Sequence, residues 1–343
     1  MPDAAARTFL TALPKAELHV HLEGTLEAED LLRFAARNDV DVPWTSPEQV
    51  RAAYEFTGLE HFLAVYYHGC RVLRTRDDFA ELTRTYLGSA AAQGVLRAEV
   101  FFGPQTFLDA GVPVADQFDG VLDGMAAARE AWGVDAALLV SAQRHRTEDA
   151  ALEMLDLVSP WAGSIAGFGL GGAELGNPPS RFARYFSTAR DRGFRTTAHA
   201  GEEGPPAYVR EALDVCHVDR VDHGVAAARD ASLVERLRAD AVPLTVCPIS
   251  NLRLKVTPST ADHPVRALVD AGVVVTVNSD DPSYFRGGVA DNYVALQEEA
   301  GFSTDELVEL ARNSFRSSFA GPEQVAGWLA AVDDHVARSS PGR

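Results

Sequence analysis

The stretch Glu17-Leu18-His19-Val20-His21-Leu22-Glu23-Gly24 is where the interpretation of the whole chain begins. Apolar and polar residues alternate along it, which is the pattern of a strand with one buried face. Side chains two residues apart on a strand point the same way, so the spacing predicts that His19 and His21 share a face and can bind one metal ion. Taken alone, two ordinary polar residues on a half-buried strand explain the same pattern.

Seven further strand-like runs follow, each short and rich in branched or aromatic residues. The eight predicted strands are 17–21, 96–102, 135–141, 164–170, 195–199, 220–223, 243–247 and 273–278. Amphipathic or alanine-rich helical segments lie between them, at 116–132, 181–192, 207–216, 232–239 and 264–271. Alternating strands and helices imply a parallel sheet, and eight such units close a (β/α)8 TIM barrel. A doubly wound open sheet is the alternative, but it usually has a glycine-rich phosphate turn after its first strand, and His21-Leu22-Glu23-Gly24 is no such turn.

The interval between the first two strands, 25–94, is too long for one crossover helix. The sequence predicts helices there at 27–38, 52–72 and 77–92, with a connection bearing Pro and Trp at 42–47. We interpret this helical insertion as a lid near the barrel mouth. Closing helices are predicted at 287–300, 303–315 and 322–336, with a frayed tail at 339–343. Because no repeat or low-complexity linker interrupts the chain, one barrel domain over residues 1–343 is expected.

Composition narrows the classes of function. The 343 residues are 46% hydrophobic, enough for a large core, and their formal net charge of −18 argues against a nucleic-acid partner, which would need a basic face. No window approaches the apolar run of a membrane helix, and residues 1–12 lack a signal-peptide pattern. Three cysteines without a repeating spacing indicate neither a disulfide framework nor a cysteine-based zinc site, so a reduced cytoplasm is the expected compartment. The oligomeric state is left open.

Unusual polar residues follow four of the predicted strands at their carboxyl ends, where TIM barrels carry their chemistry. These residues are His19, His21, His199, Glu202, His223, Asp280 and Asp281. Any one of them could be a helix cap or a satisfied core group. Four separate strand ends carrying such residues are not expected by accident, so the sequence predicts one site built from all four.

Three imidazoles and one carboxylate suit Zn²⁺ or another borderline divalent ion, with a position left for water. The predicted ligands of one ion per subunit are His19, His21, His199 and Asp280. A metal with an open position lowers the pKa of bound water from about 15.7 to near 7, which is the chemistry of hydrolysis. We expect Glu202 to be the acid/base for the leaving group and His223 to hold the attacking oxygen. Asp281 is expected to point toward substrate.

Four ordered motifs together resemble the adenosine/adenine deaminase branch of the metal-dependent amidohydrolases. They are His19-Val20-His21, His199-Ala200-Gly201-Glu202, Asp222-His223-Gly224 and Ser279-Asp280-Asp281-Pro282. The resemblance covers residues 13–319 and implies a zinc-containing (β/α)8 barrel that replaces the C6 amino group of a purine by oxygen, releasing ammonia. It also implies that Glu202 protonates ring N1, that His223 positions the attacking hydroxide and that Asp281 hydrogen-bonds N7. The other zinc deaminase class is excluded as a pattern, because Cys247-Pro248-Ile249-Ser250 lacks the second cysteine of its motif.

Two positions bear on which purine is the substrate. Nucleoside-specific members of the family typically carry Asp where this chain has Glu23, and by that resemblance the longer acid favours free adenine, converted with water to hypoxanthine and ammonia. Adenine deaminases usually carry Asp-Ser-Ser-Glu after the fourth strand, whereas this chain has Gly171-Gly172-Ala173-Glu174. The lost side chains open room for an N9-substituted adenine, so adenosine and aminodeoxyfutalosine are alternatives. A simple turn after a strand also explains Gly171 and Gly172.

Two competing classes make different predictions. A two-metal hydrolase on the same barrel would carry a bridging Lys on its fourth strand, and 164–170 has none. One metal is therefore expected, and a single-metal amidohydrolase of another class is an open alternative. A binding protein on a degenerate barrel predicts the loss of a ligand or of Glu202, but none is missing.

Overall fold

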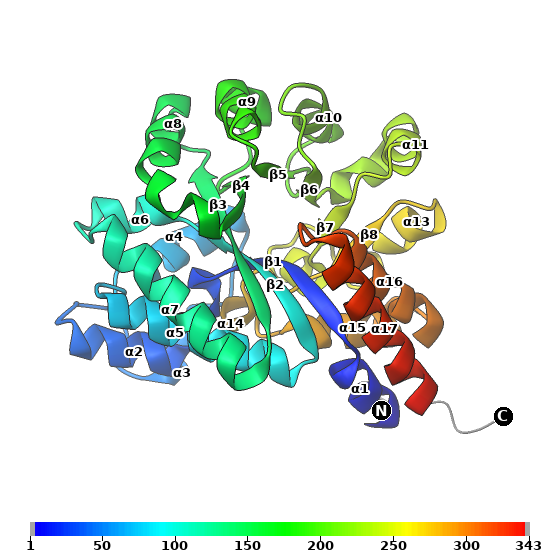
Figure 1. The fold of residues 1–343 in the computed structure, drawn as a ribbon, viewed down its shortest axis with the longest axis horizontal. Helices are drawn as coiled ribbons and strands as arrows, with labels where there is room; N and C mark the ends of the chain where they lie inside the picture. Colours follow the sequence, from blue (N-terminus) through cyan, green and yellow to red (C-terminus); the bar gives the residue numbers. More distant parts are fainter. Residues whose placement is uncertain (1–3, 340–343) are drawn as a thin grey trace.

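The computed structural model describes residues 4–339, in which eight strands alternate with helices. The strands are hydrogen-bonded in chain order and neighbouring strands are parallel. The first strand also meets the end of the last, because the Val20 backbone bridges Asp280 and the His21 N–H donates to the Asp280 carbonyl at 2.8 Å. The strands thus form a nearly closed barrel with the helices around it (Figure 1), and the predicted (β/α)8 fold is confirmed.

The elements have the following bounds. The strands are β1 (Lys15–His21), β2 (Val95–Phe102), β3 (Asp135–Gln143), β4 (Ile165–Gly171), β5 (Arg195–Ala200), β6 (Arg220–His223), β7 (Leu244–Val246) and β8 (Val275–Val277). The helices are α1 (Ala4–Ala12), α2 (Ala28–Arg37), α3 (Pro47–Ala52), α4 (Leu59–Cys70), α5 (Arg76–Ala92), α6 (Pro104–Asp109), α7 (Val114–Trp132), α8 (Glu148–Leu157), α9 (Ala183–Asp191), α10 (Pro206–Asp214), α11 (Ala231–Ala239), α12 (Pro248–Arg253), α13 (Val265–Asp270), α14 (Pro282–Phe285), α15 (Val289–Glu299), α16 (Thr304–Arg316) and α17 (Pro322–Ser339).

The helical insertion after β1 is confirmed, but its internal boundaries differ from the prediction. The helix predicted at 52–72 begins only at Leu59, and a separate short helix, α3, occupies 47–52. Pro47 starts that helix because a proline fits the first helical position, and the Ser46 side chain accepts a hydrogen bond from the Gln49 N–H. Besides α3, the helices α1, α6, α8, α12 and α14 were not predicted.

The two ends of the described chain pack together, with α1 against α17 (Figure 1). The Phe9 carbonyl lies 3.2 Å from His335 Nε2, and the two rings are in contact. Ser339 ends α17, whereas the rest of the tail predicted at 339–343 lies outside the described residues. Within 4–339, none of the helices has the length and apolar character needed to cross a membrane.

A buried ion cluster joins opposite sides of the barrel. Glu99 on β2 accepts hydrogen bonds from Arg97 at 3.0 Å, from Arg220 at the start of β6 at 2.6 Å and from the Phe319 N–H at 2.6 Å. Both Glu99 and Arg220 are at most 1% exposed. Their mutual attraction is needed because an unpaired charge in this interior would be very costly.

Removing the charge of Glu99 is therefore expected to destabilise the protein strongly. We expect Glu99→Gln to lower the free energy of unfolding by about 3–5 kcal/mol, since the buried Arg220 guanidinium loses its counter-charge, whereas Arg97 keeps its ion pair with Asp135. Urea unfolding followed by circular dichroism measures the change. The matched control is Glu309→Gln, which breaks exposed pairs with Arg312 and Arg316 and should cost less than about 1 kcal/mol. Similar losses in the two variants would contradict the structural role of Glu99.

Candidate active site

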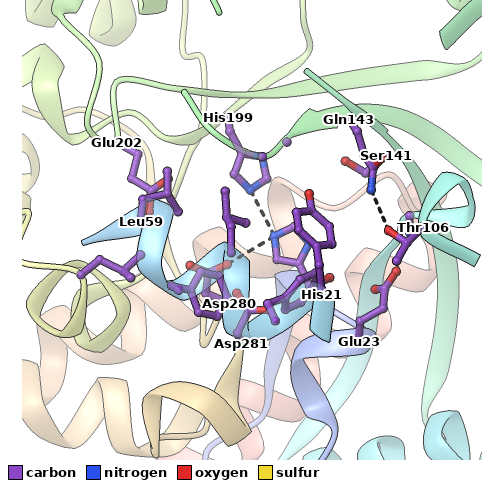
Figure 2. Close-up of a pocket in the computed structure, with 18 of the residues that line it drawn as sticks. His21, Glu23, Leu59, Thr106, Ser141, Gln143, His199, Glu202, Asp280 and Asp281 are labelled. Atoms are coloured by element: carbon purple, nitrogen blue, oxygen red, sulfur yellow. Dashed lines mark hydrogen bonds and ion pairs between the residues drawn. The ribbon is translucent and has the colours of Figure 1, made fainter. Parts of the chain in front are cut away.

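Three strands bring the predicted metal ligands to one point. His19 and His21 come from β1, His199 from β5, and Asp280 lies in the loop that follows β8, three residues after Val277. Their four ligand atoms all lie within 4.8 Å of one another. His199 Nε2 is 3.0 Å from His19 Nε2 and 3.2 Å from His21 Nε2, and Asp280 Oδ1 is 3.3 Å from both β1 histidines. Figure 2 shows His21 directed at His199 and Asp280.

A local irregularity of β1 accompanies this convergence. The pairing of β1 with β2 slips by one residue between Glu17 and Val20, which is the signature of a bulge. Bulges redirect side chains and occur often beside active sites. The carboxylate of Glu17, on the same strand, makes other contacts. It accepts a hydrogen bond from Tyr86 Oη at 2.7 Å.

The ring orientations of the histidines fit a bound cation. His19 Nδ1 lies 3.2 Å from the Thr245 carbonyl, which only accepts hydrogen bonds, so Nδ1 carries the hydrogen and Nε2 presents a lone pair. His199 Nδ1 faces the Asp222 carboxylate at 3.3 Å, which leaves His199 Nε2 in the same state. Two lone pairs 3.0 Å apart repel each other unless a cation lies between them. Ligands about 2.0–2.1 Å from one tetrahedral ion are roughly 3.3–3.4 Å apart, close to the spacing found here.

Asp222 connects two of these histidines through a buried network. Its Oδ1 accepts from Thr197 Oγ1 at 2.7 Å and from Thr245 Oγ1 at 2.9 Å. The β5–β6 register pairs His199 directly with Asp222, which places the carboxylate beside the ring. Sequence reasoning quoted Asp222 as part of a motif but did not assign this contact, because the partner strand and its register cannot be read from the motif.

Glu202 and His223 lie next to the ligand cluster. His223 Nε2 is 3.6 Å from Glu202 Oε1 and 3.7 Å from Asp280 Oδ2, and all three side chains are at most 5% exposed. Burial, and then the nearby charges of Asp280 and Glu174, hold the pKa of Glu202 well above its usual range. Burial therefore favours the protonated form of Glu202, and a carboxylic acid in that form can donate a proton.

The loop that carries Glu202 is held by Glu174, a residue that sequence reasoning missed. Both oxygens of the buried Glu174 carboxylate accept backbone hydrogen bonds, from Gly201 N–H at 2.6 Å and from Glu203 and Gly204 N–H at 2.8 Å each. The only sequence signal was an acidic residue at the end of Gly171-Gly172-Ala173-Glu174. Its target could not be inferred because the two loops are separated by 27 residues or more along the chain.

Glu23 and Asp281 are two further buried carboxyl groups that line the cavity. Glu23 Oε1 accepts from the Gly103 N–H at 2.8 Å, whereas Glu23 Oε2 and Asp281 Oδ1 are buried without a hydrogen-bond partner among the described residues. Burial raises the pKa of Glu23, and burial together with the charge of Asp280 raises that of Asp281 well above its usual range. Both groups are therefore poised to hydrogen-bond a ligand rather than another part of the chain.

A cavity of about 60 Å³ lies over these groups and is covered by the helical insertion. The helix α4 contributes Leu59, Phe62 and Tyr66 to its wall, as expected of a lid. Gly171 and Gly172 line it as well. Gly172 has a φ of +97°, a conformation that favours glycine, while a Cβ at Gly171 would lie 3.3 Å from Ser141 Oγ. The turn thus favours glycine at 172, and at 171 even a Cβ would be in tight contact with Ser141.

Comparisons with known proteins agree with this arrangement. A sequence model of a family described as adenosine deaminase matches residues 14–335. An adenine deaminase from Rhodopseudomonas palustris (strain BisB18) is 48% identical over 331 residues, which are 96% of each chain. The crystal structure of an adenine deaminase from Arthrobacter aurescens is 46% identical, with a TM-score of 0.93 over 95% of this chain and 100% of that chain. An amidohydrolase from Burkholderia ambifaria, solved with bound Zn, is 30% identical, with a TM-score of 0.92 over 99% of this chain and 96% of that one.

Proposed function

The chain belongs to the adenosine deaminase family, and from that premise we propose that it hydrolyses the C6 amino group of adenine to give hypoxanthine and ammonia. The observation that carries the choice of a purine base is the pair of incompletely hydrogen-bonded buried carboxyl groups, Glu23 and Asp281, which line the cavity together with Glu202. A purine ring offers nitrogen partners on each of its edges. The adenine deaminases among the relatives support the same substrate.

We infer that the metal is one Zn²⁺ per subunit. The residues that would hold it are His19, His21, His199 and Asp280. When bound, such an ion makes a water molecule nucleophilic at neutral pH. Support comes from the imidazole-rich donor set and from the Zn found in the Burkholderia ambifaria relative. A single domain over residues 1–343 and a cytoplasmic location stay predictions of the sequence.

The chain's own side chains account for the proton movements. Glu202 donates its proton to ring N1, which makes C6 more electrophilic. His223 holds the attacking oxygen, and Asp281 donates a hydrogen bond to N7, which fixes the ring plane. Addition of oxygen to C6 is followed by cleavage of the bond from C6 to the amino nitrogen. One proton of the attacking water restores the acid form of Glu202, and the other, from the hydroxyl group now on C6, passes to the amino nitrogen, which leaves as ammonia.

Glu23 is the residue that favours the free base. Figure 2 shows Glu202 and Glu23 on opposite sides of the cavity. If N1 faces Glu202, the N3 and N9 edge of the ring faces Glu23, so a substituent on N9 would meet this carboxyl. An N9-substituted adenine such as adenosine or aminodeoxyfutalosine is the second candidate, because Gly171 and Gly172 line the cavity without side chains.

A substrate panel tests the proposal. We expect the zinc-loaded protein to release ammonia from adenine with a kcat/KM at least about tenfold above those for adenosine and aminodeoxyfutalosine, as one lost or gained contact is worth that much. Purine absorbance and an enzymatic ammonia assay measure the rates. In Glu23→Asp we expect a lower ratio of kcat/KM for adenine to kcat/KM for adenosine, since the carboxyl group of the shorter side chain lies farther from the N9 edge of the ring. Absence of ammonia from every 6-aminopurine, with zinc bound, would refute deamination.

A second variant tests the position of Asp281. A Cβ at Gly24 would lie 1.9 Å from Asp281 Oδ1 and 2.7 Å from Asp281 Cβ, so Gly24→Ala must displace that side chain. We expect kcat/KM for adenine to fall by about 100-fold, the usual cost of a misplacement of about 1 Å. The control is Gly163→Ala, where a Cβ has no neighbour within 4 Å. Unchanged kinetics in Gly24→Ala would remove Asp281 from the binding site.

A further inference from the structure

A buried line of hydrogen bonds leads from the loop before α13 to His223. The Val265 N–H donates to His263 Nδ1 at 3.0 Å, and a backbone N–H can only donate. His263 Nδ1 therefore carries no hydrogen, and the ring hydrogen lies on Nε2, which faces Asn251 Oδ1 at 3.0 Å. Burial lowers the pKa of His263 to about 4, in keeping with a neutral ring.

The donor and acceptor groups of the Asn251 side chain are assigned in the same way. Its Oδ1 accepts from His263, so its NH₂ group faces the opposite way, 3.4 Å from His223 Nδ1. An NH₂ group only donates, and His223 Nδ1 must therefore accept. The backbone of Asn251 holds the side chain in place, because its N–H donates to Cys247 at 3.0 Å and its carbonyl accepts from Val256 at 2.9 Å.

We propose that Asn251 and His263 are positioning residues that hold His223 as the neutral tautomer with its hydrogen on Nε2. The hydrogen bond made by one ring nitrogen determines whether the other nitrogen carries the hydrogen. Here the series of hydrogen bonds begins at the Val265 N–H, which can only donate. The inference rests on the proposed function in one respect, namely that His223 holds the attacking oxygen.

The consequence concerns what His223 can do. Its Nε2 points between Glu202 Oε1 and Asp280 Oδ2, at 3.6 and 3.7 Å, and so directs its hydrogen into the cavity. In this tautomer His223 donates a hydrogen bond to the attacking oxygen and cannot remove a proton from it. If the ring hydrogen moved to Nδ1, a lone pair would face the attacking oxygen and the hydrogen bond would be lost.

Asn251→Asp is the decisive variant because it replaces the NH₂ group by an oxygen of almost the same size. The carboxylate accepts from His223 Nδ1, so the ring hydrogen is expected to move there. Nuclear magnetic resonance of the ¹⁵N-histidine-labelled holoprotein reports which ring nitrogen is protonated, and a His223→Asn spectrum identifies the residue. We expect Nδ1 of His223 to be unprotonated in the wild type and protonated in Asn251→Asp. A wild-type Nδ1 that is protonated overturns the proposal, whether or not the protein deaminates adenine.

Kinetics give an independent readout. We expect kcat for adenine to fall by about 10- to 100-fold in Asn251→Asp, with KM changed by less than about threefold, because the residue acts through His223 and not on substrate. His263→Gln keeps an amide N–H for Asn251 Oδ1 and should retain most of kcat, whereas His263→Leu should lose about tenfold. Equal losses in the two His263 variants would overturn the proposal.

Two measurements separate positioning from a general structural role. Metal content should be unchanged in every variant, and loss of metal from Asn251→Asp would contradict the proposal. Asn313→Asp is the matched control, since Asn313 lies on α16, away from the ligand cluster, and its side chain accepts a hydrogen bond from Arg316 at 3.2 Å. We expect that variant to alter neither the His223 spectrum nor kcat. If Asn251→Asp does not fold, the wild-type spectrum and the His263 pair still decide the question.

Discussion

Glu202→Gln is expected to keep its metal and to lose about 10²- to 10⁴-fold of kcat for adenine. The amide has nearly the same shape and can still donate a hydrogen bond, but it has no proton to transfer to N1. Burial and the charges of Asp280 and Glu174 hold the pKa of Glu202 well above its usual range, which favours the protonated form that the proposed step needs. Steady-state kinetics and metal analysis on the same sample measure the two expectations.

The control for this variant makes the same chemical change elsewhere. Glu153 is an exposed residue of α8, and Glu153→Gln should leave kcat unchanged. Full turnover by Glu202→Gln would overturn its assignment as the proton donor. Loss of metal from Glu202→Gln would instead give the residue a structural role, because the proposed ligand set does not include it.

Removal of the metal is expected to abolish turnover, to below about 1% of the original rate, because the proposed reaction relies on the ion to make water nucleophilic at neutral pH. One equivalent of Zn²⁺ per chain should restore it. The melting temperature should fall on chelation, since the ion binds only the folded protein and its removal leaves the lone pairs of His19 and His199 facing each other at 3.0 Å. Calorimetry and metal titration measure both effects.

Variants of the ligands refine this test. His21→Ala should lose the ion, and His217→Ala, at an exposed histidine between α10 and β6, should retain it. Full activity after complete chelation would refute the metal-dependent reaction. If activity returned only with two Zn²⁺ ions per chain, the prediction of one ion per chain would be wrong.

The barrel could be predicted because its signal is local. Each strand is a short run of branched or aromatic residues, and the eight observed strands begin and end within two residues of the predicted ones. The insertion was harder, because helix ends there depend on single residues. Pro47 and its capping partner Ser46 start α3 within a stretch that was expected to be a connection.

The sequence by itself determined which residues are available for chemistry, and the resemblance of its motifs indicated a family that the comparisons confirm. Residue type and position at the end of a strand were sufficient to select His19, His21, His199 and Asp280, because all parallel strands of a barrel end at one face. The order of the strands around the barrel is then enough to predict that these four side chains meet at one site.

Only the tertiary structure decided how these groups are held. Asp222 beside His199, Glu174 beneath the Glu202 loop and Asn251 beside His223 are contacts between segments 23 to 28 residues apart. The free oxygens of Glu23 and Asp281 likewise follow from which neighbours fail to reach them. Such contacts depend on strand register and on the path of each loop through space, and a hydrogen bond forms or is lost over less than one ångström.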